Sequence, residues 1–445
     1  MDVLVNITEK LNSPDKLSRL KAVEEIARLI KKGEITRQES EEVNNHVHTI
    51  YSFSPYSPSS AAYHAWKAGL KTIGIMDHDS IAGCTELIQS CKILGLASTV
   101  GCEIRVNFDQ TRLQGRQINS PDSKNIAYIA IHGIPQCQFA RTKNFLKPIK
   151  ERRNYRNRLM VDRMNQVLLD YGMEKIDYYR EVVSLSQARE GGSITERHLL
   201  FALAQKIMRQ ISQGEKLICF LEKRLKIVIP EKVKPFLIDL SNPYYAYDLL
   251  GILKSSFMEK IFIAPDQTEC ISVYEAIDFI NSITAIPAYA YLGDVRESPT
   301  SDKKSQKFED DYLEELFDEI KRIGFKAVTY VPPRNTAQQL RRIQKLCQRH
   351  NLMEISGVDI NQPRQSFNCP EILKPQFHHL IDMTWALIAH EKLANYNAIY
   401  ALFHEQNPLR NRSLSDRVKV YSSMGRNIDP FNPERVEHLI PISEF

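Results

Sequence analysis

The chain has 445 residues, 43% of them hydrophobic and 25% charged, and a formal net charge of +5. This composition is ordinary for a globular protein, and the chain contains no internal repeat or low-complexity tract. Basic residues alternate with acidic ones, so the charge does not indicate a dominant nucleic-acid surface. The length allows one large domain with insertions or two to three smaller domains.

Cysteine usage and the absence of targeting signals bear on the compartment. The 8 cysteines form no C-x-x-C pair, which favours buried, reduced thiols in a cytosolic protein. Residues 1–10 lack the pattern of a secretory signal, and no apolar run reaches transmembrane length. We therefore expect a cytoplasmic protein with no membrane partner.

The first half of the chain alternates helical and strand-like patterns. A helix with helical apolar spacing begins near Pro14 and ends at Gly33. Further expected elements, in chain order, are a strand at 43–50, a helix at 59–70, a strand at 72–76, a strand at 100–106, a polar surface loop at 109–124 and a strand at 126–131.

The second half begins with a charged helix. Residues 151–169 predict this helix, and a basic cluster at 147–158 is better explained by a solvated helix face than by a phosphate site. Residues 193–196 resemble a capping box before a helix at 197–208. The later expected elements are mainly helical structure at 209–280, a strand at 283–291, a polar loop at 296–309, helices at 312–323 and 336–349, strands at 327–331 and 353–358, and helices again beyond 371.

Histidines and carboxylates recur at the ends of these strands. Two histidines at positions i and i+2 of a strand point to the same face. A single histidine at a strand end is more often an ordinary surface residue, but strand ends of an α/β barrel converge on one face, so the recurrence favours a shared pocket. Imidazole with carboxylate suits zinc, manganese or iron. The candidate residues are His46, His48, His78, Glu103, His132 and Asp359, with His198 at a helix start.

The motifs around these residues resemble those of the polymerase and histidinol phosphatase (PHP) family of metal-dependent phosphoesterases. H-V-H-T-I-Y-S at 46–52 is similar to the first family motif, H-x-H-T-x-x-S, and M-D-H-D at 76–79 is similar to T-D-H-D. G-C-E at 101–103 and I-H-G at 131–133 are similar to the next two motifs. E-R-H at 196–198 and S-G-V-D-I-N at 356–361 are similar to R-x-H and S-G-S-D-x-H.

The resemblance implies the fold and the domain organisation. The implied fold is α/β, a distorted (β/α)7 TIM-like barrel with helical N-terminal, inserted and C-terminal segments. The expected boundaries are 1–40 for the N-terminal helical segment, 41–208 and 281–370 for the two parts of the PHP barrel, 209–280 for the mainly helical insertion and 371–445 for the C-terminal helical extension.

The resemblance also implies two divalent transition-metal ions, which would be manganese, zinc or iron. One ion would be held by His46, His48, Glu103 and Asp359. A second ion would share Glu103 and take His132 and His198, because a bridging carboxylate suits two neighbouring cations.

A third ion of the family has fewer ligands in this chain. Only His78 and Asn361 remain for it, because Phe53 stands where an Asp or His is expected and Asn361 replaces a histidine. An amide oxygen is a weaker ligand than imidazole for these metals. We therefore expect the third site to be empty or weak.

Such a site would hydrolyse a phosphoester through a metal-bridged hydroxide. His78 would then serve as general acid or phosphate donor, and Arg197 would act on the phosphate. Arg334 and Tyr289 are further candidates for substrate binding, although a surface salt bridge explains Arg334 better and simple packing explains Tyr289 equally well.

The leading hypothesis is a cytoplasmic metal-dependent phosphoesterase acting on a small phosphorylated molecule. One alternative is a nuclease-like phosphodiesterase on nucleotide or nucleic-acid ends, which the near-balanced charge disfavours. The other is a degenerate PHP domain with a structural or regulatory role, for which Phe53 and Asn361 are the evidence.

Overall fold

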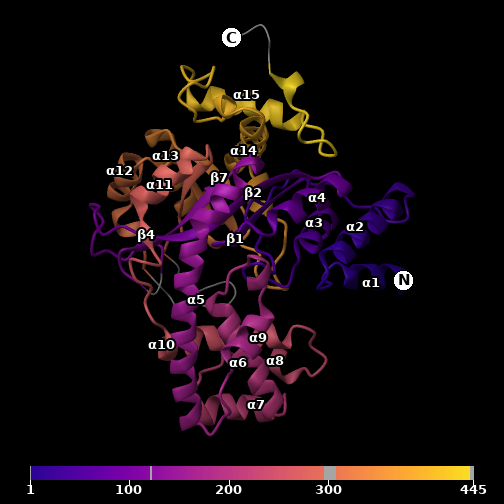
Figure 1. The fold of residues 1–445 in the computed structure, drawn as a ribbon, viewed down its shortest axis with the longest axis vertical. Helices are drawn as coiled ribbons and strands as arrows, with labels where there is room; N and C mark the ends of the chain where they lie inside the picture. The colour runs from indigo at the N-terminus through magenta and orange to yellow at the C-terminus, as the bar shows by residue number, and fades with distance from the viewer. Residues whose placement is uncertain (1, 121–122, 295–306, 441–445) are drawn as a thin grey trace.

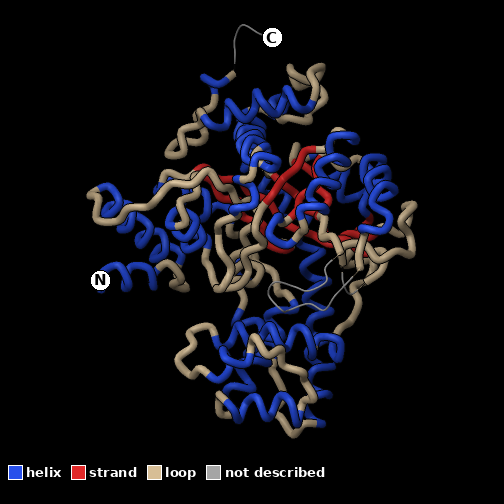
Figure 2. The backbone as a smooth tube through the Cα atoms, turned by 180° about the vertical axis from the view of Figure 1, so that it is seen from behind, coloured by secondary structure: helices blue, strands red, loops and turns tan. Residues whose placement is uncertain are grey.

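The computed structural model describes residues 2–120, 123–294 and 307–440. Figure 1 shows a part built around a β-sheet, with a helical lobe below it and the long helix α5 running from one to the other. The sheet is wrapped by helices, as the tube view in Figure 2 also shows. The fold is therefore mixed α/β with a curled sheet.

The sheet has the strand order β1-β2-β3-β5-β6-β7, and β4 pairs separately with β2. Strand β3 runs antiparallel to both of its neighbours, while the other pairs are parallel. The sheet therefore departs from a uniform series of parallel βα units. The strands are β1 (Thr72–His78), β2 (Ala97–Asn107), β3 (Ile126–His132), β4 (Ile271–Ser272), β5 (Ile286–Ala290), β6 (Ala327–Tyr330) and β7 (Met353–Ser356).

The segment at 43–50, expected as a strand, is extended but forms only isolated bridges. Val47 bridges Ile75 of β1 on one side and Ile360, just beyond β7, on the other. The regular ladder is interrupted because the side chain of Asn44, rather than a backbone carbonyl, accepts the hydrogen bond from the His46 amide. The segment nevertheless lies between the first strand and the chain that follows the last one.

Both faces of the central strands are covered. All residues of β2 except the last are buried, as is typical of strands enclosed by helices on one side and by side chains of the curled sheet on the other. On the N-terminal side α3 (Pro58–Lys67) and α4 (Cys84–Leu94) lie against the sheet, α2 (Lys16–Lys31) packs on these two helices, and α1 (Asp2–Lys10) packs on α2. The helices around the sheet later in the chain are α11 (Val273–Ser282), α12 (Leu313–Ile323), α13 (Ala337–His350) and α14 (His379–Tyr396), and α15 (Leu414–Arg426) packs on α14.

The helical lobe has a hydrophobic core of its own. This second core comprises residues from Met160 to Ile261 together with Phe53, and the boundary expected at 209 falls inside it. Helix α5 begins at Phe139, earlier than the predicted start at 151, because Pro148 and several lysines obscure the helical pattern. The lobe contains part of α5 (Phe139–Asp170), α6 (Glu196–Gln210), α7 (Glu215–Cys219), α8 (Lys234–Ile238), α9 (Tyr245–Ser256) and α10 (Met258–Ile261).

No helix in the described ranges is long and apolar enough to span a bilayer. A polar loop was expected at 109–124, and residues 109–120 and 123–124 do form a loop. Residues 121–122 lie outside the described residues. Most of the loop expected at 296–309 also lies outside them, since residues 295–306 are not described.

Candidate metal centre

The segment with His46 and His48 is tied to the segment with Asp359 by one amide side chain. Asn44 Oδ1 accepts hydrogen bonds from the amide of His46 (3.0 Å) and from the amide of Val358 (2.8 Å). The two segments approach closely because residue 357 is glycine, where a Cβ atom would lie 2.6 Å from the Cβ of His46. Sequence motifs far apart in the chain are thus joined at the site.

Asp77, the residue before His78, holds the loop that follows His48. Its carboxylate accepts hydrogen bonds from the amide of Thr49 (2.7 Å), the hydroxyl of Thr49 (2.7 Å) and the hydroxyl of Ser52 (2.6 Å). Asp77 is fully buried, and burial raises the pKa of its carboxyl group. The sequence analysis missed this role.

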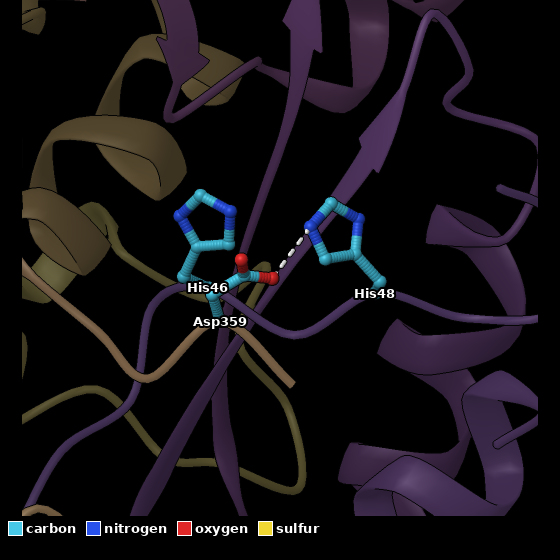
Figure 3. Close-up of side chains that lie close together, drawn as sticks. All are labelled: His46, His48 and Asp359. Carbon is cyan, nitrogen blue, oxygen red and sulfur yellow. Dashed lines mark ion pairs between the residues drawn. The ribbon is translucent and has the colours of Figure 1, made fainter. Parts of the chain in front are cut away.

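Three histidine–carboxylate contacts form the centre. His48 Nε2 lies 3.1 Å from Asp359 Oδ1, and Figure 3 shows the Asp359 carboxylate between the rings of His46 and His48. Glu103 contacts His46 Nε2 with one oxygen (3.2 Å) and His78 Nδ1 with the other (3.2 Å). Two sets of ligand atoms lie within 4.8 Å of one another, and these are His46, His48 and Asp359, and His48, His78 and Glu103.

The charges in this cluster are set by burial and by the carboxylates. Burial lowers the pKa of His46, but Glu103 and Asp359 outweigh it and raise that pKa to about 9. Burial, together with the neighbouring His48 and Arg153, holds the pKa of His78 well below its usual value. A bound cation requires an unprotonated ring nitrogen, so His78 is in the form that binds metal, whereas metal binding at His46 would displace its proton.

His132 ends β3 and is buried with an unsatisfied nitrogen. Its Nε2 has no hydrogen-bond partner within the described parts of the chain. Burial and the neighbouring His46 lower the pKa of His132 to about 3, so the ring is neutral. A buried lone pair without a partner fits a metal ligand. His132 belongs to neither of the two close ligand sets found among the described residues.

His198 occupies the third position of α6 and takes part in capping that helix. The amide of Thr195 donates to His198 Nδ1 (3.0 Å), and the Thr195 hydroxyl lies 3.2 Å from the same nitrogen. The capping box therefore joins Thr195 to His198. It begins two residues later in the chain than the capping box expected at 193–196. A metal on Nε2 would need the other tautomer, with Nδ1–H donating to the Thr195 hydroxyl. Burial and Arg153 lower the pKa of His198 to about 3.

Glu103 was expected to bind two metal ions and to share the second with His132 and His198. Its carboxylate meets His78, whereas His132 and His198 are not gathered with it into one close ligand set. The described residues therefore offer two possible ligand sets that share His48, and Glu103 is equally close to His46 and to His78.

Phe53 and Asn361 stand where the family pattern has metal ligands. Phe53 has a φ of +90°, which is strained for a bulky residue, and its ring lies edge-on to the ring of His198 with centroids 5.0 Å apart. Asn361 donates from its amide nitrogen to Asp359 Oδ1 (2.5 Å). The first residue thus packs against a candidate ligand, and the second orients another.

The centre opens into a cavity of about 210 Å³. A second cavity of about 200 Å³ is lined by Lys92, Glu391 and other residues but by no histidine, so chemistry rather than size distinguishes the candidate site. Arg197 lines the first cavity. Tyr289 and Arg334 are not among its lining residues.

Packing and a hydrogen bond explain why Tyr289 and Arg334 do not line the cavity. Tyr289 is fully buried and packs edge-on to Phe325, because alternate residues of β5 point to opposite sides and Ala290 faces the cavity. Arg334 Nε donates to the carbonyl of Leu292 (3.3 Å). Both residues lie beside the site rather than in it.

Sequence analysis missed three cations that line the same cavity, namely Arg105, Arg153 and Lys254. Arg105 follows Glu103 by two residues on β2, so strand alternation was a signal for it. Arg153 belongs to the basic cluster that was expected to form a solvated helix face, and that expectation is wrong at this position, where the residue is 2% exposed. The cavity therefore combines candidate metal ligands with guanidinium groups that pair with buried carboxylates.

Comparisons with known proteins agree with this chemistry. A family model described as PHP domain matches residues 44–223, a range that includes six of the seven candidate residues but not Asp359. No curated protein matches the chain. The match supports a metal-dependent hydrolase, and the described histidine and carboxylate groups could bind metal.

Two solved structures are similar at low identity. One is a "putative metal-dependent phosphoesterase" of Bifidobacterium adolescentis, with 16% identity, a TM-score of 0.48 and coverage of 76% of this chain and 96% of that chain. The other is an amidohydrolase of Chromobacterium violaceum with bound sulfate and no metal, with 16% identity, a TM-score of 0.48 and coverage of 77% and 96%. The motifs and the gathered ligand atoms agree with the family match, and residues 44–223 of the chain match the PHP domain.

Proposed function

We propose that this protein is a metal-dependent phosphoesterase that hydrolyses a small phosphorylated molecule. The observation that best supports the proposal is the meeting of His46, His48 and Asp359, from opposite ends of the family motif series, with ligand atoms within 4.8 Å of one another. Imidazole with carboxylate is the donor set that manganese, zinc and iron share.

In this proposal His46, His48, Asp359 and the shared Glu103 hold one ion. A second ion lies toward Glu103, with His78, His132 and His198 as its candidate ligands. Divalent ions bound there supply hydroxide near neutral pH and neutralise charge on phosphoryl oxygens.

The protein's own residues would orient the substrate around these ions. Arg197 would clamp the phosphate in a bidentate fork, since it lines the cavity next to the metal ligands. Asn361 would keep the Asp359 carboxylate turned toward the ions through its 2.5 Å hydrogen bond. Arg334 and Tyr289 would act only by supporting the cavity wall.

The same proposal extends to the architecture. The segment at 43–50 would complete a distorted (β/α)7 barrel, because it is hydrogen-bonded to β1 and to the chain beyond β7. The barrel would lie within 41–208 and 281–370, and residues from Met160 to 208 would pack with the insertion at 209–280 in the helical lobe. The flanking segments would be 1–40 and 371–445. We propose the cytoplasm as its compartment.

The test measures metal content of the purified protein by elemental analysis, together with hydrolysis of a chromogenic phosphomonoester in the presence of manganese. We expect about two metal ions per chain and turnover that His48→Ala reduces by at least about a hundredfold. His438→Ala is the matched control, because His438 is exposed and remote in sequence from every motif, and it should leave both measurements unchanged.

Other results would replace the proposal. Turnover of a short single-stranded oligonucleotide without turnover of the phosphomonoester would favour the nuclease-like phosphodiesterase. No bound metal and no turnover after reconstitution would favour a structural or regulatory PHP domain.

A further inference from the structure

A buried group of ion pairs lies beside the candidate metal centre. Its three guanidinium groups and three carboxylates balance in formal charge, and none of the six side chains is more than 14% exposed. We call this group the arginine–carboxylate cluster, and its members are Asp79, Arg105, Arg153, Arg156, Glu196 and Glu269.

Within the cluster, Arg153 joins two segments that each bear a candidate ligand. One of its terminal nitrogens donates to Asp79 Oδ2 (2.5 Å), and the other donates to Glu196 Oε2 (2.7 Å). Asp79 directly follows His78, and Glu196 precedes His198 by two residues. One planar side chain therefore spans the distance between the end of β1 and the start of α6.

The two joined segments belong to different hydrophobic cores. Strand β1 packs in the larger core around the sheet, whereas α6 packs in the second core of the helical lobe. Arg153 lies on α5, which extends through both regions, as Figure 1 shows. The relative position of His78 and His198 is thus not set within either core alone.

The backbone at Asp79 also connects the end of β1 to Glu103. Asp79 has a φ of +50°, a left-handed conformation that side chains with a Cβ adopt at some energetic cost. Its amide donates to the backbone carbonyl of Glu103 (2.8 Å), so the same residue connects the end of β1 to the β2 backbone at Glu103. Arg153 holds the Asp79 side chain while the backbone makes this contact.

We propose that Arg153 is a positioning residue, which fixes the geometry between the His78 and His198 sides of the metal centre by bridging Asp79 and Glu196. It acts through these two carboxylates and not by contact with an ion. The proposal rests on the proposed function only in treating the histidines as metal ligands.

Arg156 provides a matched control on the same helix. It lies almost one turn beyond Arg153, is also buried, and pairs with Glu196 and Glu269, but it makes no contact with Asp79 in the part of the chain that the structure describes. Lysine keeps the positive charge at either position but cannot reproduce the planar two-pronged geometry. Arg153→Lys therefore breaks the link between Asp79 and Glu196, whereas Arg156→Lys alters the other ion pair of Glu196 and leaves the Arg153–Asp79 contact in place.

The experiment titrates Mn²⁺ into the full-length metal-free protein and measures the dissociation constant calorimetrically. We expect Arg153→Lys to weaken Mn²⁺ binding by about tenfold or more, as loss of residues that orient metal ligands usually does, and Arg156→Lys to change it by less than about twofold. Asp79→Asn breaks the same bridge from its other side and should match Arg153→Lys. Equal weakening by the two lysine variants, or none by either, would overturn the proposal.

A second measurement separates this inference from the proposed function. In protein with ¹³C-labelled histidine rings and no metal, the His78 and His198 signals should both shift in Arg153→Lys, while Arg156→Lys leaves the His78 signal in place. Unchanged signals in Arg153→Lys would refute the positioning role, whether or not the protein binds manganese or hydrolyses a phosphoester.

Discussion

Single residues that carry no metal-binding atom set much of the geometry of this site. Asn44 links the segment of His46 to the segment of Asp359, and Asp77 holds the loop after His48. Motif comparison identified the ligand candidates because their residue types are distinctive. It did not identify Asn44 or Asp77, because a hydrogen bond between distant segments leaves no pattern in the sequence.

Gly357→Ala should weaken metal binding by about tenfold, a penalty of 1 to 2 kcal/mol within the usual range for overpacking. The added Cβ would lie 2.6 Å from His46 Cβ and 2.7 Å from its backbone nitrogen, so His46 would have to move. Calorimetric titration with Mn²⁺ measures the effect. Gly251→Ala is the control, because a Cβ there meets nothing within 4 Å, and unchanged affinity in Gly357→Ala would contradict the expectation.

Glu309→Gln should change how stability depends on pH. Glu309 is fully buried, and burial raises its pKa from 4.5 to about 7 despite hydrogen bonds from the Leu292 and Gly293 amides. The folded protein thus keeps a proton that the unfolded chain releases, and the free energy of unfolding falls as pH rises from 4.5 to about 7. The loss amounts to about 3 kcal/mol.

Urea denaturation at pH 5 and pH 8 measures this effect. The wild type should lose more stability than Glu309→Gln between these two values, because glutamine has no proton to release. An equal loss in both proteins would show that Glu309 is not the source of the pH dependence.

Helix α6 illustrates how one element serves both folding and the site. Its sequence predicted a helix at nearly the observed place, but the capping residues differ from the expected ones because His198 completes the box with Thr195. A neutral imidazole carries a hydrogen on one of its two ring nitrogens. While His198 Nδ1 accepts the hydrogen bond from the Thr195 amide, that hydrogen is on Nε2, and Nε2 cannot bind a metal ion. Only the folded helix start reveals this competition.

Thr195→Ala should lower the free energy of unfolding by about 1 kcal/mol, the usual cost of losing an N-cap side chain. It also removes the hydroxyl that lies 3.2 Å from His198 Nδ1, and with it the acceptor for the metal-binding tautomer. We therefore expect weaker metal binding in addition to lower stability. Thr195→Ser keeps the hydroxyl and should preserve both properties in urea denaturation and Mn²⁺ titration; an identical loss in the serine variant would contradict this account.

At the scale of the whole molecule, the sheet region and the helical lobe have separate hydrophobic cores that meet at the candidate metal centre. Phe53, close to the first motif, belongs to the core of the lobe, and α5 extends from one region to the other. A ligand bound between them should therefore stabilise the entire protein, because it favours the folded state in which both regions are in place.

Metal removal should lower the thermal stability of the protein. At a metal concentration about a hundred times the dissociation constant, binding adds about 2.7 kcal/mol to the free energy of unfolding. Differential scanning calorimetry should therefore give a higher Tm with Mn²⁺ than with a chelator, and His48→Ala should abolish the difference. A Tm that is the same in both conditions for the wild type would contradict binding at this centre.

The sequence by itself determined the alternation of helices and strands, the PHP motifs and the residue types of the centre, because periodicity, turn residues and distinctive motifs are local properties. The tertiary structure decided which ligand atoms meet, that β3 runs antiparallel to its neighbours, and that Arg153 and Arg156 are buried rather than solvated. These features depend on contacts between residues distant in the chain, such as His48 with Asp359. Packing and charge pairing across such distances arise only when the chain folds.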